Sequence, residues 1–128
     1  MKAPTGILAM TILLASCKEA PIAAPMDLVK EDPVKVDPTH YKIEFENDQV
    51  RLLHATYGPH EKSPMHSHPD YAIIGATGGN TRETTEGGKI VESTGGPGVG
   101  SGKAMRHSME NLGDKPFESY ILEYKKTK

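Results

Sequence analysis

Two histidines lie one residue apart in the stretch "MHSHPDY", residues 65–71. Side chains in an extended strand alternate between its two faces, so His66 and His68 would project from the same face. Neutral imidazole is the commonest metal ligand in proteins, and two imidazoles on one face can share an ion. The alternative is that two ordinary surface histidines lie close together by chance. The spacing therefore supports a metal-site hypothesis and raises the question of what completes the coordination shell.

The composition of the chain favours short strands over long helices. Its 128 residues include 13 Gly and 10 Pro but no Trp, and 36% of the residues are hydrophobic. Frequent turn formers and few aromatic residues are typical of strands joined by turns, and a chain of this length accommodates one domain with one core. We therefore expect a single all-β domain.

The charge pattern and the motif content exclude several classes of function. The formal net charge is -2, and no run of Lys and Arg forms a concentrated basic face, so we expect no nucleic-acid partner. The chain has no G-x-S-x-G motif, P-loop or dinucleotide fingerprint, and its single cysteine lies near the N-terminus. Any chemistry would therefore go through a metal.

The first residues have the layout of a secretory leader. Lys2 precedes an apolar run over residues 6–15, and small residues follow before Cys17. The run is too short to cross a hydrocarbon core of about 30 Å as a helix, so cleavage by a peptidase is expected. We predict a signal peptide over residues 1–16.

The end of this leader resembles the bacterial lipobox, which covers Leu14 to Cys17 here. The resemblance implies that Cys17 is lipidated and becomes the mature N-terminus, whereas the alternative is a free thiol in a discarded peptide. Several acyl chains would anchor the protein stably to a bilayer. We therefore expect an exported, membrane-anchored lipoprotein on the periplasmic or cell-surface side, without a choice between inner and outer membrane.

A proline-rich segment follows the cysteine, and strands follow that segment. Residues 17–38 predict a semi-extended tether, so the folded domain should cover residues 39–128. Tyr41, Ile43 and Phe45 alternate with charged residues, which indicates a half-buried strand. Further strands are predicted at 50–57, 71–76, 81–85, 89–93 and 117–124, whereas residues 95–102 are a glycine-rich, low-complexity stretch. Many short strands without helices imply a sandwich or barrel, with any ligand inside it or at its mouth.

Two motifs resemble those of the cupin family, whose members are small β-barrels of the jelly-roll type. The first motif includes H-x-H, which matches His66 and His68 after a longer interval from Gly58 than is usual. The second ends in H-x-x-x-N, and His107 and Asn111 fall at the family spacing. The resemblance covers nearly all of the predicted domain and implies a single-domain cupin barrel.

The resemblance also implies a metal site. The family's three histidine ligands correspond to His66, His68 and His107, whereas its fourth ligand, a glutamate, falls on Ala72 or Ile73, neither of which can ligate. Three neutral imidazoles suit one divalent transition metal, and Fe, Mn, Ni, Zn and Cu are not distinguished. They leave the charge of the ion uncompensated, so an anionic partner is expected.

Asp70 is the one nearby carboxylate that falls on the same face as His66 and His68, if the strand continues through Pro69. A turn formed by the Pro-Asp pair is its more ordinary role. Tyr71 could orient a substrate or pack in the core, as could Tyr57. Asn111 could support the turn that follows it or orient His107. These residues are auxiliary candidates.

The other polar and sulfur-containing candidates have more ordinary interpretations. His40 and His54 have no partner at ligand spacing and are interpreted as structural or surface residues, and His60 and Glu61 as exposed loop residues. The methionines next to the histidine motifs, Met65, Met105 and Met109, are interpreted as gap-filling side chains.

Three functions are compatible with these motifs. The first is a metal-dependent enzyme acting on a small molecule, and the second is a module that binds a metal or small ligand without turnover. The third is a degenerate structural or partner-binding domain. The three histidines favour the first two functions, and the missing glutamate favours the last two. A homodimer is expected only by analogy with the family.

Overall fold

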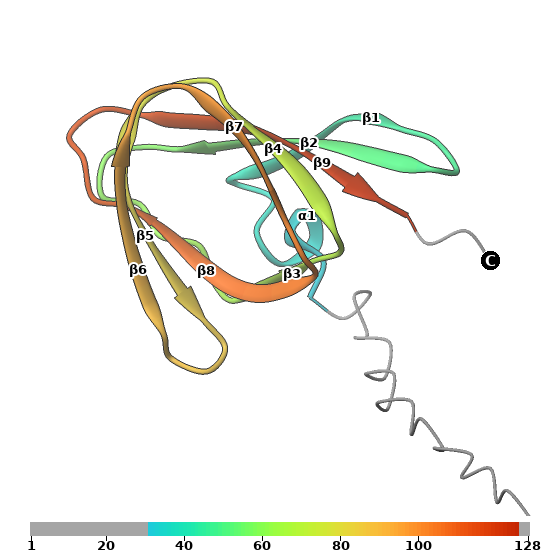
Figure 1. Ribbon diagram of the computed structural model, residues 1–128, viewed down its shortest axis with the longest axis horizontal. Helices are drawn as coiled ribbons and strands as arrows, with labels where there is room; N and C mark the ends of the chain where they lie inside the picture. Colours follow the sequence, from blue (N-terminus) through green and yellow to red (C-terminus); the bar gives the residue numbers. More distant parts are fainter. Residues whose placement is uncertain (1–30, 126–128) are drawn as a thin grey trace, which may run out of the picture.

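The computed structural model describes residues 31–125 and contains two antiparallel β-sheets (Figure 1). One sheet has five strands in the order β1-β2-β9-β4-β7, and the other has four in the order β3-β8-β5-β6. The all-β expectation is confirmed, with one four-residue helix as an addition. The elements are α1 (Pro33–Val36), β1 (Tyr41–Glu46), β2 (Val50–Tyr57), β3 (His66–His68), β4 (Tyr71–Gly75), β5 (Gly79–Thr85), β6 (Ile90–Gly95), β7 (Gly98–Gly102), β8 (Met105–Asn111) and β9 (Phe117–Tyr124).

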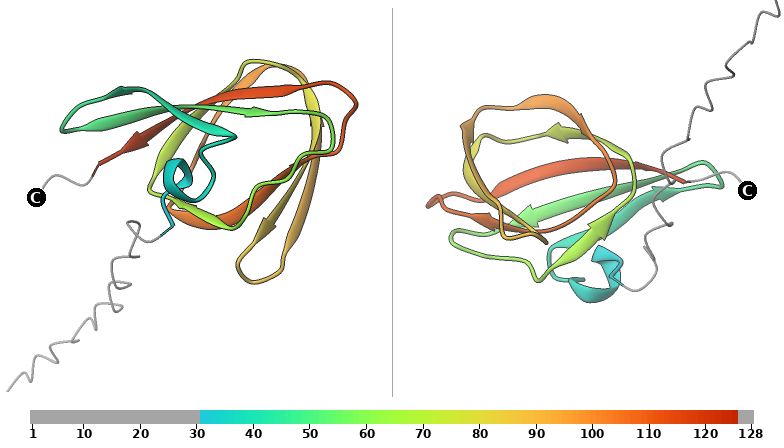
Figure 2. Two further views of the ribbon diagram at one scale, coloured as in Figure 1. Left: turned by 180° about the vertical axis from the view of Figure 1, so that it is seen from behind. Right: turned by 60° about the horizontal axis from the view of Figure 1, so that its bottom comes forward.

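Strands that are distant in the sequence lie side by side in both sheets. β8 pairs with β3 and β5, and β9 pairs with β2 and β4. Figure 2 shows the sheets curving around a shared interior. Side chains from the early H-x-H motif and from the last two strands therefore meet inside the barrel.

The hydrophobic core lies between the sheets. Alternate residues of β2 are buried, namely Leu53, Ala55 and Tyr57, because successive side chains of a strand point to opposite faces. Val34, Tyr71, Ile73, Met109 and Phe117 pack against this core. β9 also buries two polar side chains, Ser119 and Glu123. Buried polar groups need partners, so this strand connects the core to the candidate site.

The end of the segment predicted as a tether is folded. Asp32 caps α1 by accepting from the Val34 amide at 3.2 Å, and Pro33 is buried. Asp32 also forms an ion pair with Arg51 of β2 at 3.0 Å, and the Ser67 amide donates to the Glu31 carbonyl at 2.9 Å. Residues 31–38 therefore belong to the domain, which corrects the expected boundary at residue 39. Proline is common both in linkers and at the first position of a helix, so the proline content of this segment does not distinguish the two.

The first strand is less buried than its alternating pattern predicts. Tyr41 is buried, but Ile43 and Phe45 are 45% and 51% exposed. β1 is an edge strand, and its hairpin with β2 extends past the four-stranded sheet (Figure 1). The register against β2 also shifts after Ile43, which lies opposite the buried Leu53, so Phe45 lies opposite Leu52 and on the other face of the sheet. The predicted alternation therefore ends at this bulge.

The glycine-rich stretch is also more ordered than its composition indicates, because part of it forms strand β7. The predicted signal peptide, Cys17 and residues 17–30 lie outside the described residues. Within residues 31–125 no helix is long and apolar enough to cross a membrane.

Candidate metal centre

The pairing of β3 with β8 brings three histidines together. His66 lies directly opposite His107 in this antiparallel pair, and His68 lies two residues along the same face. One ring nitrogen from each histidine can be chosen so that all three lie within 4.8 Å of one another. All three are buried: His66 is 0% exposed, His68 1% and His107 5%. The structure thus assembles the three residues that the sequence motifs single out.

Each imidazole is held by a hydrogen bond at Nδ1. The acceptors are the Pro64 carbonyl for His66 at 2.9 Å, the Glu123 carboxylate for His68 at 2.6 Å and the Glu83 carboxylate for His107 at 3.0 Å. A neutral imidazole that donates from Nδ1 presents a lone pair at Nε2. This is the arrangement by which proteins fix the tautomer of metal-ligating histidines.

Two of the three Nε2 atoms have no hydrogen-bond partner. Those of His68 and His107 are buried and unsatisfied, and they are the only such side-chain atoms among the described residues. Leaving one buried nitrogen without a hydrogen bond lowers the stability of a fold by about 1–3 kcal/mol, so two such atoms side by side need an explanation. A shared metal ion accounts for both atoms.

The third Nε2 has a competing partner. The Tyr41 hydroxyl lies 3.0 Å from Nε2 of His66, and the Tyr57 hydroxyl donates to the Tyr41 oxygen at 2.7 Å. Because Nδ1 of His66 donates to a carbonyl, its Nε2 accepts from Tyr41. A metal on this nitrogen would take the lone pair that Tyr41 now uses.

Burial keeps His66 and His68 neutral at ordinary pH. It lowers the pKa of His66 to about 3, with the neighbouring His68 adding to the effect, and it also lowers the pKa of His68. The hydrogen bond from His107 lowers the pKa of Glu83, so that carboxyl is ionised. The site therefore combines imidazoles with free lone pairs and adjacent carboxylates.

A buried charge network supports His68 from the far side. Glu123 is 2% exposed, and its second oxygen accepts from Arg51 Nη2 at 2.6 Å. Arg51 in turn pairs with Asp32 at 3.0 Å. The N-terminal segment is thereby linked to a candidate ligand through two ion pairs.

Sequence reasoning did not single out Tyr41, Glu83, Arg51 or Glu123. One signal was available for Glu123, because it continues the alternate-residue pattern of Phe117, Ser119 and Ile121 and so falls on the buried face of β9. A carboxylate on a buried face needs a partner, but the pattern does not identify which one.

Asp70 lies away from the histidines. Its carboxylate accepts from the Ala104 amide at 2.8 Å and from the Lys103 ammonium at 3.1 Å, and its side chain is 49% exposed. It stabilises the connection between β7 and β8, which differs both from a role next to the metal and from a turn of its own with Pro69. Pro69 and Asp70 lie between β3 and β4, so the alternation of side-chain faces that would put Asp70 beside the histidines ends at His68.

Asn111 also has a turn role. Its side-chain amide donates to the Gly58 and Lys115 carbonyls at 2.9 and 2.8 Å, and its oxygen accepts from the Gly113 amide at 3.0 Å. The structure gives it no hydrogen bond to His107. Asn111 thus holds two loops together at the start of β9.

Tyr71 lies beside the site. Its ring is 5.8 Å from that of His68 between centroids, and its hydroxyl donates to Met105 Sδ at 3.3 Å. Of the two methionines nearest the second motif, Met109 lines the cavity next to the histidines. Tyr71 and Met109 therefore shape the space that a ligand would fill.

The remaining candidates have structural roles. His40 is held between Asp37 and Glu61 at 2.8 and 3.2 Å and stacks on Tyr57. His54 stacks on Tyr120 on the outer face of β2. His60 is exposed and pairs with Asp114 at 2.8 Å. None of these three histidines lies in the cluster of His66, His68 and His107.

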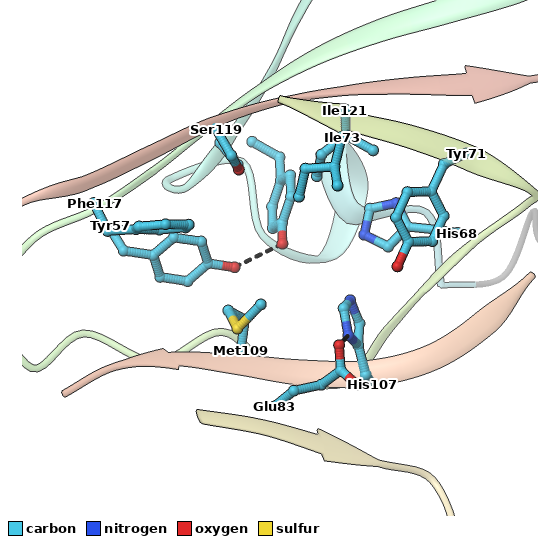
Figure 3. Close-up of a pocket in the computed structure, with 12 residues that line it drawn as sticks. Tyr57, His68, Tyr71, Ile73, Glu83, His107, Met109, Phe117, Ser119 and Ile121 are labelled. Carbon is cyan, nitrogen blue, oxygen red and sulfur yellow. Dashed lines mark hydrogen bonds and ion pairs between the residues drawn. The ribbon is translucent and has the colours of Figure 1, made fainter. Parts of the chain in front are cut away.

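A cavity of about 70 Å³ adjoins the histidines (Figure 3). Its walls are mostly apolar, and Figure 3 shows His68 and His107 at one end of it and Phe117 at the other. Ile73 lines it on β4, where the family resemblance would have put a glutamate at either Ala72 or Ile73. The carboxylates near the site are Glu83 and Glu123 instead, and both act through the imidazoles.

No family model and no curated protein matches this sequence. Many solved structures match the fold. A cupin domain from Bordetella pertussis Tohama I superposes with a TM-score of 0.62 at 21% identity, over 67% of this chain and 92% of that chain. The fold is that of a cupin.

Two more solved structures agree with this assignment. An RmlC-like cupin with a double-stranded β-helix fold from Methanocaldococcus jannaschii has a TM-score of 0.54 at 14% identity, over 66% of this chain and 77% of that chain. A Cupin 2 conserved barrel domain protein from Salinispora arenicola CNS-205 has a TM-score of 0.53 at 19% identity, over 84% and 91%. The expected jelly-roll barrel is confirmed, and in this cupin fold the three-histidine cluster is compatible with a metal ion.

Proposed function

We propose that this chain binds one divalent transition metal through Nε2 of His66, His68 and His107, and that the metal binds a small molecule in the adjoining cavity. The observation that carries the proposal is the pair of buried, unpartnered Nε2 atoms on His68 and His107. Hydrogen bonds at Nδ1 already fix all three tautomers for coordination. The bound ion would supply Lewis-acid chemistry.

The protein's own groups would set the charge and the geometry of this centre. Glu83 and Glu123 place negative charge behind two of the imidazoles, which partly compensates a divalent ion held by neutral ligands. The cavity walls are mostly apolar, so electrostatic interactions there are stronger than in bulk water.

Metal analysis of the purified full-length protein tests the ligand assignment. We expect about one metal ion per wild-type chain and a large loss in His107→Ala, because structural and catalytic sites of this kind need their third protein ligand. His54→Ala is the matched control, since His54 lies on the outer face of β2. Negligible and equal metal in wild type and His107→Ala would overturn the assignment.

Binding without turnover is the second candidate function. It is favoured by the apolar side chain of Ile73 in the cavity wall, at one of the two positions where the resemblance would put a glutamate ligand, and by the hydrogen bond that engages Glu83 with His107. Oxygen uptake by the metal-loaded protein across a panel of small carboxylates and thiols separates the two functions. Uptake with any member supports an oxygen-using enzyme, and binding without oxygen uptake or any chemical change in the added compound supports the module.

We also propose that Cys17 carries a lipid anchor, which would place the domain at a bacterial membrane. The support is the order of leader, small residues and cysteine in the sequence. Labelled palmitate should be incorporated into the wild-type chain in a bacterial host and not into Cys17→Ser. Equal incorporation of palmitate into the wild-type chain and Cys17→Ser would contradict the anchor.

A further inference from the structure

We propose that Phe117 is a specificity-determining gate that separates the metal-side cavity from an outer cavity and so limits the size of the ligand that reaches the histidines. This inference rests on the proposed function. It identifies the route of access and the class of ligand, neither of which the metal site alone defines.

Phe117 lines two neighbouring cavities. The inner cavity, of about 70 Å³, contains His68 and His107 in its wall. The outer cavity, of about 140 Å³, is lined by Gly75, Thr81 and Ser93 among others, and Phe117 belongs to both walls. In Figure 3 the Phe117 ring stands at the end of the inner cavity opposite the two histidines.

Strand alternation shows that the outer cavity continues the inner one. On β4, Ile73 lines the inner cavity and Gly75, two residues later, lines the outer cavity. On β5, Glu83 lines the inner cavity and Thr81, two residues earlier, lines the outer cavity. Residues two apart in a strand share a face, so both cavities lie along the same inward faces.

The outer cavity is the side that faces solvent. Ser93 and Gly95 in its wall are exposed residues of β6, whereas the histidines of the inner cavity are buried. A small molecule from solvent would thus meet the outer cavity, then the Phe117 ring, and then the metal. Glycine at position 79 leaves room for this ring, because a Cβ there would lie 3.2 Å from its Cδ2 atom.

The size and lining of the inner cavity indicate the ligand class. A dry cavity of about 150 Å³ accommodates benzene, so a cavity of about 70 Å³ favours a ligand smaller than benzene. Neither cavity has Lys or Arg in its wall, so a negative group that does not touch the metal would find no cationic partner there. The class is therefore a molecule with a metal-coordinating head and a short, uncharged tail.

Two hydroxamates on the cobalt-loaded, full-length protein test the gate. Acetohydroxamate and benzohydroxamate share the chelating head and differ in the tail, and visible absorption of cobalt(II) reports binding of each. Wild type should bind acetohydroxamate and discriminate strongly against benzohydroxamate. Phe117→Ala should tighten benzohydroxamate binding by at least about tenfold and change acetohydroxamate binding much less, since apolar pockets discriminate by size on this scale.

Phe45→Ala is the matched control, because it removes the only other phenylalanine of the chain, which is 51% exposed on β1. It should leave the ratio of the two affinities unchanged. Phe117→Leu keeps an apolar side chain, is less disruptive to folding, and should give an intermediate ratio.

The cobalt spectrum recorded before any hydroxamate is added separates the two ways of failing. Wild type without a cobalt spectrum would overturn the metal site and the gate with it. Normal cobalt binding with the same affinity ratio in wild type, Phe117→Leu and, where it folds, Phe117→Ala would overturn the gate alone. Tight binding of benzohydroxamate to wild type would likewise show that the ring does not limit ligand size.

Discussion

Replacing Glu123 by Gln removes a buried charge that supports a candidate metal ligand. Glu123 is 2% exposed and accepts from His68 Nδ1 at 2.6 Å and from Arg51 Nε at 2.7 Å. Glutamine has nearly the same shape and retains one acceptor oxygen. The change therefore tests the charge and the orientation of the hydrogen bonds, with little change in side-chain volume.

Two separate effects are expected from Glu123→Gln. Carboxylates that hold metal-bound histidines contribute about 10- to 100-fold to metal affinity, so zinc binding should weaken by that factor, or about 1.4–2.8 kcal/mol. The metal-free protein should also lose stability, because removing one partner of a buried ion pair costs about 3–5 kcal/mol. We expect the lower end of this range, because Arg51 retains its ion pair with Asp32 at 3.0 Å.

Zinc affinity is measured by competition with a chromophoric chelator, and the free energy of unfolding by urea titration in the presence of excess chelator. Glu118→Gln is the control on the same strand, because Glu118 is 40% exposed and lies 3.6 Å from His54, outside the cluster. It should change neither quantity appreciably. Wild-type zinc affinity in Glu123→Gln together with lowered stability would show that Glu123 serves the fold alone and would refute the reasoning.

Three other perturbations have defined outcomes. Tyr41→Phe removes the hydroxyl that competes for Nε2 of His66, so zinc affinity should rise severalfold, by the roughly 0.5–1.5 kcal/mol net value of a hydrogen bond, in the same competition assay; weaker binding would show that Tyr41 assists the metal. The pKa of His66 is lowered to about 3, so the unfolded chain binds a proton near pH 6.5 that the metal-free fold does not. Urea titrations should therefore show stability falling as pH drops from about 6.5 towards 3, by up to about 1.4 kcal/mol per pH unit, and a flat profile would contradict burial of this group. A Cβ on Gly102 would overlap the Tyr71 ring, so Gly102→Ala should lower the melting temperature with a cost of about 1–3 kcal/mol, whereas Gly100→Ala meets one methyl group at 3.5 Å and should be nearly neutral.

Local patterns predicted some strands and missed others. The bounds predicted for 50–57 and 117–124 are those of β2 and β9, because strand-forming residues between turn formers are a local signal, whereas β7 and β8 were not predicted. The H-x-H spacing likewise placed His66 and His68 on one face without knowledge of any neighbour. The position of His107 followed from a resemblance between motifs, and the register of β3 against β8 supplies its physical basis.

Features that depend on pairing between distant segments were not predicted. The tether boundary was wrong because Glu31 and Asp32 are fixed by Arg106 and Arg51, which come from other strands. Asp70 was assigned a metal-facing parity that ends at Pro69, and its carboxylate instead holds the turn before β8. The local sequence was compatible with either role for each segment, and the residue that each carboxylate contacts elsewhere in the fold decided between the two roles.

The sequence by itself indicated an all-β chain and two histidines on one strand face, and it predicts a leader over residues 1–16 that lies outside the described residues. The tertiary structure decided what surrounds that histidine pair: β8 adds His107, β9 and β5 add the carboxylates at Nδ1, and Phe117 lines the cavity beside them. The reason is that strand periodicity is local, whereas sheet order and register bring together residues that no short-range pattern relates.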